Sequence, residues 1–334
     1  MTDVTREEAV VLQGTGGVWR VRTGSGESRD VSLRGRLKKD DSGRRADGSL
    51  RRDTLRSKLT RLKLAVGDHV VIEREERGDE WAIVEILPRR SRLARRSPGG
   101  ALGERVVVAN LDQVVVVFAA ANPEPHVGMI DRFLVIAEGN GLHARLVVNK
   151  AELVGEHEVR RRFGLYERVG YPLHVTSTRQ PLGLDALRAA LAGQTSALSG
   201  PSGVGKSSLV NALYPGLNLR VGAISESVNK GRHTTVGALL TPLPDGGFVA
   251  DTPGLREVGL WNLPPGELPD CFPEFRPFLD ECRFADCSHR TEPGCAVRAA
   301  VGSTPDAAIS VERFESYCKL REELERLAVQ ARAW

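Results

Sequence analysis

Residues 200–207 constrain the fold more than any other part of the chain, because they form a loop that can wrap a phosphate. The eight residues are Gly200, Pro201, Ser202, Gly203, Val204, Gly205, Lys206 and Ser207. This Gly-x4-Gly-Lys-Ser spacing lets backbone N–H groups face inward, since glycine leaves room that a side chain would fill. We expect a strand at residues 197–199, then this loop, then a helix whose positive N-terminus faces the phosphates. Lys206 is placed to reach the β- and γ-phosphates and Ser207 to bind Mg²⁺. Ser208 is the last residue of this segment that we expect to bind the nucleotide.

Two downstream motifs can complete a phosphate site. Asp251-Thr252-Pro253-Gly254 follows an apolar run at residues 248–250. There, Asp251 can hold Mg²⁺ through water and the Gly254 N–H can reach a γ-phosphate. Between the two motifs, residues 231–235 read Gly-Arg-His-Thr-Thr. Thr234 and Thr235 can cap Mg²⁺ and sense the γ-phosphate, as a first switch does. The other interpretation of this segment is an ordinary polar loop.

A further pair of motifs can recognise a base. Asn149-Lys150-Ala151-Glu152 follows an apolar run at residues 144–148 and has the pattern Asn-Lys-x-acid. Asn149 would bond the base and support the phosphate loop, and the aliphatic stem of Lys150 would cover one face of a guanine. The carboxylate would accept both N–H bonds that guanine offers and adenine does not. The acid is Glu152 rather than the shorter Asp, so an ATP-using enzyme remains an alternative. Ser177 is the candidate to lie beside guanine O6.

The order of these motifs indicates a rearranged chain. The guanine motifs at residues 149 and 177 precede the phosphate motifs at residues 200, 231 and 251. In the usual GTPase the phosphate motifs come first. The cyclic order is unchanged, and a parallel sheet can be reopened at another surface loop without moving its site. We therefore predict a circularly permuted P-loop domain.

Changes in composition divide the chain into four segments. Residues 1–88 contain five short apolar runs separated by glycine-rich turns, and we predict an OB-type β-barrel. Residues 89–105 have the composition of a basic linker. Residues 106–262 alternate buried strands with helices, which is typical of an α/β fold with a mostly parallel sheet and helices on both faces. Residues 263–334 begin proline-rich and end in a predicted amphipathic helix over residues 311–331.

The basic residues are concentrated in two clusters, although the net charge is only +4. Residues 34–63 hold 12 Lys and Arg against 4 Asp and Glu. The second cluster consists of Arg89, Arg90, Arg92, Arg95 and Arg96. Each cluster is either a solvated loop or an arm that contacts nucleic-acid phosphates. Residues 40–57 are expected to form a loop that becomes ordered, at best, on binding.

The N-terminus lacks the apolar core of a signal peptide, and the longest strongly apolar run, residues 114–121, is too short to span a bilayer. We expect a cytoplasmic protein with no membrane partner, monomeric in solution. Five cysteines without an export signal favour metal binding or free thiols over disulfides.

Four metal-ligating residues lie within a window of 14 residues. Cys282, Cys287, His289 and Cys295 have the spacing Cys-x4-Cys-x-His-x5-Cys. Three thiolates and one imidazole form a closed tetrahedral set, which is typical of a structural zinc site with no open position for chemistry. Cys271 and Cys318 remain as packing thiols.

Taken in order, these motifs resemble the RsgA (YjeQ) family of ribosome-associated GTPases, and the resemblance covers nearly the whole chain. It implies GTP and GDP as ligands, Mg²⁺ and one structural Zn²⁺ as metals, and the small ribosomal subunit and its rRNA as partners. It also implies a role late in small-subunit maturation, and GTP hydrolysis stimulated by that subunit. The chain departs from the family pattern at Glu152 and in the additional loop at residues 40–57.

Hydrolysis of GTP requires a positioned water, and the residue after Gly254 is Leu255 rather than a water-positioning Gln. We expect slow intrinsic turnover, with His233 substituting when the ribosome orders the first switch. The alternative for His233 is packing or contact with an rRNA phosphate. An alternative for the whole protein is a nucleotide-gated RNA-binding module in which hydrolysis is incidental.

Overall fold

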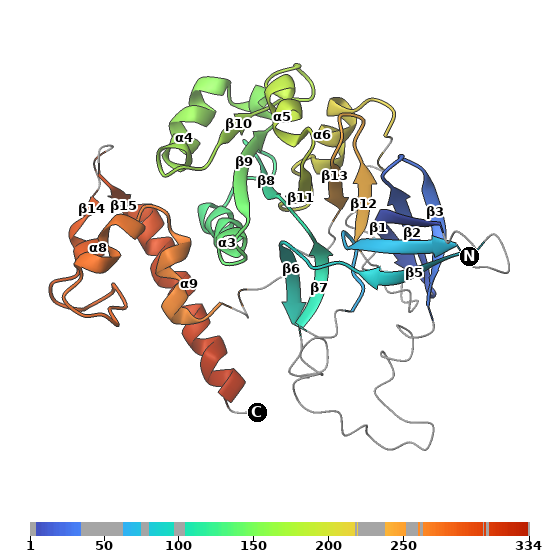
Figure 1. Ribbon diagram of the computed structural model, residues 1–334. Helices are drawn as coiled ribbons and strands as arrows, with labels where there is room; N and C mark the ends of the chain where they lie inside the picture. The colour runs from blue at the N-terminus through green and yellow to red at the C-terminus, as the bar shows by residue number, and fades with distance from the viewer. Residues whose placement is uncertain are drawn as a thin grey trace.

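The computed structural model of the chain contains an N-terminal barrel, a central six-stranded sheet and a C-terminal unit of short helices ending in one long helix (Figure 1). It describes residues 5–34, 63–74, 80–96, 104–217, 219, 238–251, 260, 263–302, 304 and 307–332. Most of the first basic cluster, including residues 40–57, lies outside these ranges.

The N-terminal part is a closed five-stranded barrel, as the sequence predicts. Its strands are β1 (Arg6–Thr15), β2 (Val18–Thr23), β3 (Ser28–Leu33), β4 (His69–Arg74) and β5 (Trp81–Ile86). They follow the order β1-β2-β3-β5-β4, and β4 closes on β1. Side chains alternate along each strand, so that one set fills the barrel interior.

A two-stranded hairpin, β6 (Arg92–Arg96) and β7 (Glu104–Ala109), lies between the barrel and the sheet. Strand β6 falls within residues 89–105, the range predicted as a linker. The apolar run at residues 106–109 was expected in the main sheet, but it pairs with β6 instead. Val108 of this run packs against the barrel instead. It is fully buried there and forms a β-bridge with Val66.

Buried polar contacts join this hairpin to the barrel. The Asp68 carboxylate is fully buried and accepts bonds from Arg89, at 2.6 Å from Nε. Asn110 donates from Nδ2 to the Gly67 carbonyl at 2.9 Å. Gly67 has φ +85°, and a Cβ there would lie 2.2 Å from the Ala109 carbonyl oxygen, so only glycine allows this close approach.

The central sheet is mostly parallel and has the order β10-β9-β8-β11-β13-β12, in which only β12 runs antiparallel to its neighbour. Its strands are β8 (Gln113–Ala119), β9 (His143–Asn149), β10 (Leu173–Val175), β11 (Thr195–Ser199), β12 (Leu239–Pro242) and β13 (Phe248–Asp251). Its helices are α3 (Val127–Glu138), α4 (Glu156–Arg168), α5 (Leu184–Leu191) and α6 (Lys206–Leu213). Helices α3 and α4 share a buried cluster with one face, and α5 and α6 with the other. The predicted α/β fold is confirmed.

The C-terminal unit packs against the α3 side of the sheet. It contains the 3₁₀ helices Pro265–Glu267, Pro269–Cys271 and Arg276–Glu281, α8 (Ala296–Ala299), β14 (Val301–Gly302), β15 (Ile309–Ser310) and α9 (Val311–Arg332). The long helix α9 corresponds to the one expected at residues 311–331. Within the described ranges, no helix is both long and apolar enough to cross a membrane.

One buried cation joins this unit to the sheet domain. Arg313, at the start of α9, lies 2.6 Å from Asp131 on α3 and 2.6 Å from Glu274. All three side chains are at most 3% exposed. Tyr166 of α4 donates its hydroxyl to Asp131 at 2.8 Å, and the Phe272 ring lies 4.5 Å from the guanidinium. The two carboxylates neutralise the guanidinium, and together they fix α9 on α3.

Replacing Arg313 with Met should therefore lower the free energy of unfolding by about 3–5 kcal/mol, because two buried carboxylates lose their cation. Arg160→Met is the matched control, since Arg160 pairs with Glu156 on an exposed helix face at 3.0 Å. Its loss should be about 0.5 kcal/mol or less. Urea unfolding followed by circular dichroism measures both variants, and equal midpoints would contradict the role assigned to Arg313.

Candidate nucleotide site and metal centre

The predicted nucleotide motifs lie at the carboxyl ends of adjacent parallel strands. The phosphate loop follows β11, the Asn149 loop follows β9, and β8 runs between these two strands. In open parallel sheets, ligands bind outside the carboxyl ends of the strands. The fold therefore brings together two motifs that are about fifty residues apart in the sequence.

The phosphate loop depends on glycine at two close approaches. A Cβ on Gly200, where φ is +141°, would lie 2.0 Å from the Val117 carbonyl oxygen of β8. A Cβ on Gly205, where φ is +94°, would lie 2.6 Å from Nδ2 of Asn149. Helix α6 begins at the next residue, Lys206. The loop is therefore packed against β8 and the Asn149 loop, with its helix N-terminus at the open end.

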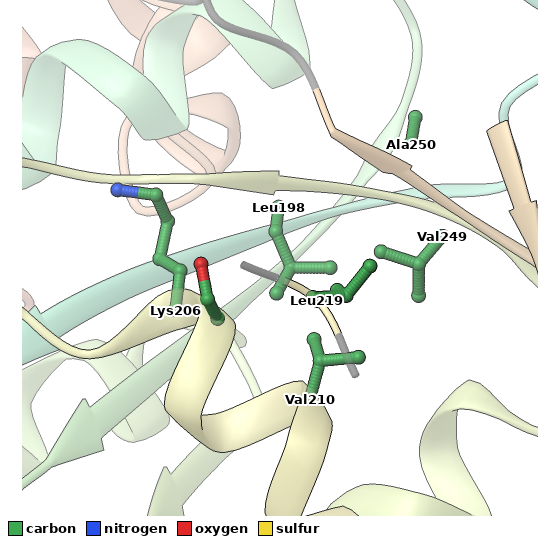
Figure 2. Close-up of a pocket in the computed structure, with 7 residues that line it drawn as sticks. Leu198, Lys206, Val210, Leu219, Val249 and Ala250 are labelled. Atoms are coloured by element: carbon green, nitrogen blue, oxygen red, sulfur yellow. The ribbon is translucent and has the colours of Figure 1, made fainter. Parts of the chain in front are cut away.

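Lys206 turns back over the phosphate loop. Its Nζ donates to the carbonyl oxygens of Gly200 and Pro201, both at 2.8 Å. Figure 2 shows the ammonium directed away from a group of apolar side chains. These side chains belong to an open hollow that is lined by Leu198, Lys206, Ser207, Val210, Leu219, Val249 and Ala250. The Ser207 hydroxyl is an oxygen that α6 brings to this hollow, and it is a group of the kind that could hold Mg²⁺.

Asn149 connects the base motif to the phosphate motif. Its Nδ2 donates to the Val204 carbonyl at 2.9 Å, inside the phosphate loop. Its Oδ1 accepts the Thr176 hydroxyl at 3.3 Å. The next residue, Lys150, is left-handed at φ +60°, and its ammonium donates to the Asn122 carbonyl. This geometry extends the aliphatic stem of Lys150 toward the Asn122 loop. An extended stem is what the covering of a planar base requires.

Glu152 has an unsatisfied carboxylate oxygen at the base position. It lies in the 3₁₀ helix Ala151–Leu153. Its Oε2 is buried and has no hydrogen-bond partner among the described residues. An unpaired buried acceptor is unfavourable, and a ligand with N–H donors on one edge, as guanine has, would satisfy it. The unpaired Glu152 oxygen therefore suits guanine as a ligand.

Ser177 lies beside this loop but uses its hydroxyl locally. Its Oγ accepts from the backbone N–H groups of Arg179 and Gln180, at 3.3 and 3.0 Å. The preceding Thr176 carbonyl accepts from the Ala151 N–H at 3.1 Å. Ser177 is thus a buried residue that stabilises its own turn, while the Thr176 carbonyl holds this segment against the base motif.

The loop after β8 also borders the phosphate loop and Lys150, which the sequence did not indicate. Pro123 lies 3.8 Å from the position of a Gly203 Cβ, and the Asn122 carbonyl accepts from Lys150. Arg162 of α4 holds this loop by donating to the Ala120 carbonyl at 3.2 Å. The only available signal was an Asn-Pro pair directly after a buried strand, which indicates a turn but not its neighbour.

Several predicted site residues lie outside the described part of the chain. These are His233, Thr234, Thr235 and Gly254. Asp251 ends β13, where its backbone pairs with Leu198 of β11 and Leu239 of β12. The strand order therefore places the Asp251 backbone next to the strand that leads into the phosphate loop.

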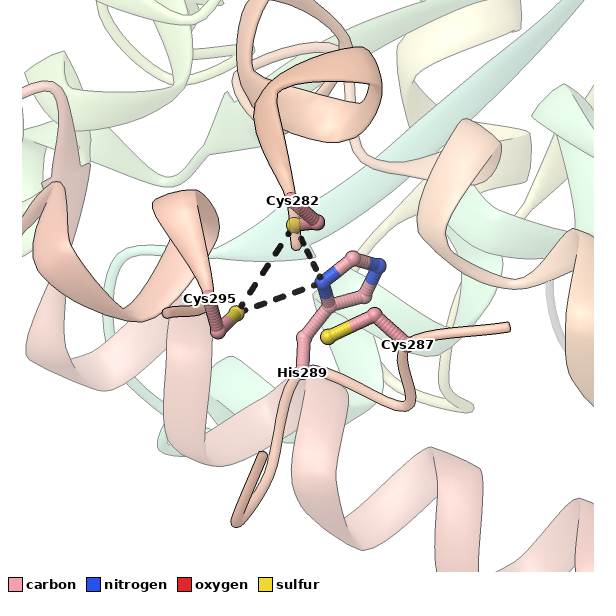
Figure 3. Close-up of side chains that lie close together, drawn as sticks. All are labelled: Cys282, Cys287, His289 and Cys295. Atoms are coloured by element: carbon pink, nitrogen blue, oxygen red, sulfur yellow. Dashed lines mark hydrogen bonds between the residues drawn. The ribbon is translucent and has the colours of Figure 1, made fainter. Parts of the chain in front are cut away.

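The four predicted zinc ligands converge in the C-terminal unit (Figure 3). Their ligand atoms lie within 4.8 Å of one another. The His289 Nδ1 atom is 3.5 Å from Sγ of Cys282 and 3.4 Å from Sγ of Cys295, and these two sulfurs are 4.0 Å apart. Ligands of one tetrahedral ion are roughly 3.5–3.8 Å apart. Cys287 supplies the fourth side of the cluster.

The chemistry of the cluster suits a cation. Burial raises the pKa of the Cys287 thiol to about 12, so its thiolate needs a compensating charge. Burial lowers the pKa of His289, which keeps the imidazole neutral, as metal binding requires. The three cysteines and one histidine could therefore hold a metal ion.

Comparison with known proteins identifies the family. The model of the RsgA GTPase family matches residues 86–261, which is more than half of the chain. The chain belongs to the RsgA GTPase family. A small ribosomal subunit biogenesis GTPase RsgA from Gemmatimonas aurantiaca is 58% identical over 96% of this chain and 98% of its own. The RsgA protein of Azotobacter vinelandii is 45% identical over 81% of this chain and 77% of its own.

Solved structures agree with this family. The crystal structure of YjeQ from Thermotoga maritima has a TM-score of 0.73 and 32% identity, and the match covers 96% of this chain and 99% of that one. YloQ, described as a circularly permuted GTPase, has a TM-score of 0.70 and 25% identity, with 96% of both chains covered. The predicted permutation is confirmed, and RsgA membership makes the chain a GTP hydrolase rather than an ATP-using enzyme.

The contact between Gly205 and Asn149 generates a test. Gly205→Ala should weaken binding of a fluorescent GDP at least tenfold, because the new methyl group pushes Asn149 away from the phosphate loop. The control is Gly170→Ala, where φ is +104° but nothing lies within 4 Å of the new Cβ. Both variants carry similar backbone strain, so equal affinities would show that the Asn149 contact does not support the loop.

Proposed function

We propose that this protein hydrolyses GTP during late maturation of the small ribosomal subunit, binding that subunit through its rRNA. The observation that carries the nucleotide part is the hydrogen bond from Asn149 to Val204, beside the unsatisfied Glu152 carboxylate oxygen. One side of this junction suits guanine and the other suits phosphates. The relatives named for small-subunit biogenesis support the partner.

The described residues have separate roles in binding GTP. Residues 200–205 cradle the phosphates with their backbone N–H groups, and α6 directs its positive end toward them. Lys206 exchanges its two carbonyl acceptors for the β- and γ-phosphate oxygens. Ser207 and Asp251 hold Mg²⁺, which neutralises charge on the phosphates. Glu152 accepts the N–H donors of guanine, and the Lys150 stem covers the ring.

His233 orients the attacking water, and Thr234 and Thr235 sense the γ-phosphate. This assignment rests on their place between the two phosphate motifs, and on Leu255 standing where a water-positioning Gln is common. Without His233 at the γ-phosphate, the chain has only charge neutralisation to lower the barrier, and turnover is slow. The subunit accelerates hydrolysis by placing His233 against the attacking water.

The barrel and the hairpin provide the RNA-binding surface. Arg90 and Arg92 of the second basic cluster are exposed where the hairpin meets the barrel. Closely spaced arginines beside a small barrel suit an RNA backbone, since each neutralised phosphate releases counterions. The protein acts as a monomer in the cytoplasm, where ribosomal subunits mature.

The metal at Cys282, Cys287, His289 and Cys295 is a structural Zn²⁺. The set is closed and largely buried, so the ion supplies cross-linking rather than chemistry. Cys282 caps the end of the 3₁₀ helix Arg276–Glu281, Cys287 and His289 lie in the loop that follows, and Cys295 is the N-cap of α8, where its Sγ accepts from the Arg298 N–H. One ion would fix these turns against Tyr317 of α9, whose ring lies 6.2 Å from His289.

Elemental analysis of the purified protein should find one zinc per chain. Cys295→Ser should lose it and lower the unfolding temperature, because the turns lose their cross-link. Cys271→Ser is the control, since Cys271 is a buried thiol that bonds the Glu267 carbonyl and lies outside the cluster. Zinc retained in Cys295→Ser, or lost from both variants, would refute the ligand set.

The experiment that tests the proposed function measures GTP hydrolysis with and without purified small ribosomal subunits. We expect small subunits to raise the rate at least tenfold and large subunits to have no such effect. Lys206→Ala should remove the activity, because the β- and γ-phosphates lose their cation. A wild-type rate that small subunits leave unchanged would rule out the ribosomal role, while leaving the nucleotide site intact.

A further inference from the structure

Strand β1 of the barrel has two buried faces. Ala9 and Val11 belong to the barrel core. Leu12, only 5% exposed, belongs instead to the main buried cluster that also contains the sheet, and Val10 packs against that cluster. Because side chains alternate along a strand, Val10 and Leu12 point out of the barrel.

A bulge is centred on Leu12. In the pairing of β1 with β2, Val11 is opposite Val21 and Gln13 is opposite Arg20, which leaves Leu12 as the additional residue. A β-bulge bends its strand and redirects a side chain. Here the redirected side chain is the buried Leu12, on the side of β1 that faces away from the barrel core.

Outside the barrel, β1 contacts β12, the edge strand of the central sheet (Figure 1). Strand β12 has only four residues, and within the described part of the chain it pairs with β13 alone. A short edge strand held by one neighbour has little local stability of its own. Leu240 of β12 is 1% exposed and lies in the same buried cluster as Leu12, so the barrel covers this edge.

The pairing of β12 with β13 connects this contact to the phosphate site. Leu240 is opposite Ala250, and Leu239 is opposite Asp251 at the end of β13. Ala250 also lines the hollow beside Lys206 and Ser207. Movement of β12 would therefore shift the backbone of Asp251 at the end of β13.

We propose that Leu12 is a positioning residue for the phosphate site: it holds β12 against β13, so that the barrel sets the place of Asp251. This inference rests on the proposed role of Asp251 in binding Mg²⁺. It makes the barrel part of the nucleotide machinery in addition to its role as an RNA-binding domain. Docking of RNA on the barrel then acts on the phosphate site through β1 and β12.

The test compares two variants of the 334-residue chain, each with one side chain shortened to alanine. Leu12→Ala shortens the side chain that β1, the strand in contact with β12, places in the cluster shared with Leu240, and Ile72→Ala removes a similar volume from the barrel interior. The first measurement is release of fluorescent GDP from the free protein as the Mg²⁺ concentration is varied. We expect Leu12→Ala to raise the Mg²⁺ concentration for half-maximal retention at least fivefold, and Ile72→Ala to leave it within twofold of wild type.

The second measurement is subunit-stimulated hydrolysis. Leu12→Ala should lower the stimulated kcat at least fivefold while its affinity for small subunits stays within twofold of wild type. Leu12→Met keeps the volume and should restore both readouts. If Leu240→Ala does not reproduce the Mg²⁺ effect, or if Ile72→Ala matches Leu12→Ala, the inference is wrong.

Failure of the proposed function would look different. In that case the wild-type protein itself would show no Mg²⁺ dependence of GDP release, or no stimulation by small subunits. A responsive wild-type protein together with a Leu12→Ala variant that behaves identically would overturn only the positioning role of Leu12.

Discussion

The hydrogen bond from Asn149 to the Val204 carbonyl is the contact on which the proposed nucleotide site depends. It joins the loop after β9 to the loop after β11, across the carboxyl end of β8. A base-binding loop and a phosphate-binding loop are useful only at the separation of one nucleotide. This bond sets that separation without regard to which loop comes first in the chain, so a permuted order leaves the site unchanged.

A second constraint is the buried Arg313. Its two carboxylate partners come from α3 and from the segment before the metal ligands. Helix α3 begins just after the Asn122 loop, which contacts both Lys150 and the phosphate loop. The C-terminal unit is therefore attached to a helix that starts at the nucleotide site. In addition, the motif ending at Gly254 leads directly into this unit along the chain.

Local features of the fold were predictable. The five barrel strands, the strand before the phosphate loop and the final helix follow from alternation, turn residues and apolar periodicity. The cysteine cluster follows from spacing, because chance rarely places four metal-ligating residues within 14 positions. Asn149, Glu152 and the phosphate loop were found as short motifs whose chemistry depends on neighbours in the sequence.

Contacts between distant segments were not predictable from the sequence. Residues 106–109 look like a strand of the main sheet, and nothing local shows that Val108 meets Val66 instead. In the sequence, Arg313 looks like a solvated helix residue. Its partner Asp131 is 182 positions away, so no local pattern connects the two. Leu12 has the pattern of an ordinary barrel residue, and the bulge that redirects it depends on the register with β2. Each depends on tertiary packing, which a periodic pattern does not encode.

The strand order of the central sheet also determines when the site can exist during synthesis of the chain. Strands β8, β9 and β10 form one half of the sheet and emerge from the ribosome first, carrying the Asn149 loop. The second half, β11, β13 and β12, carries the phosphate loop and joins the first only through β8 and β11. Domains fold largely as units as they emerge, and an unpaired β8 edge remains exposed until β11 arrives. With Asn149 and Asp251 in their proposed roles, the nucleotide site is complete only once β13 has emerged as well.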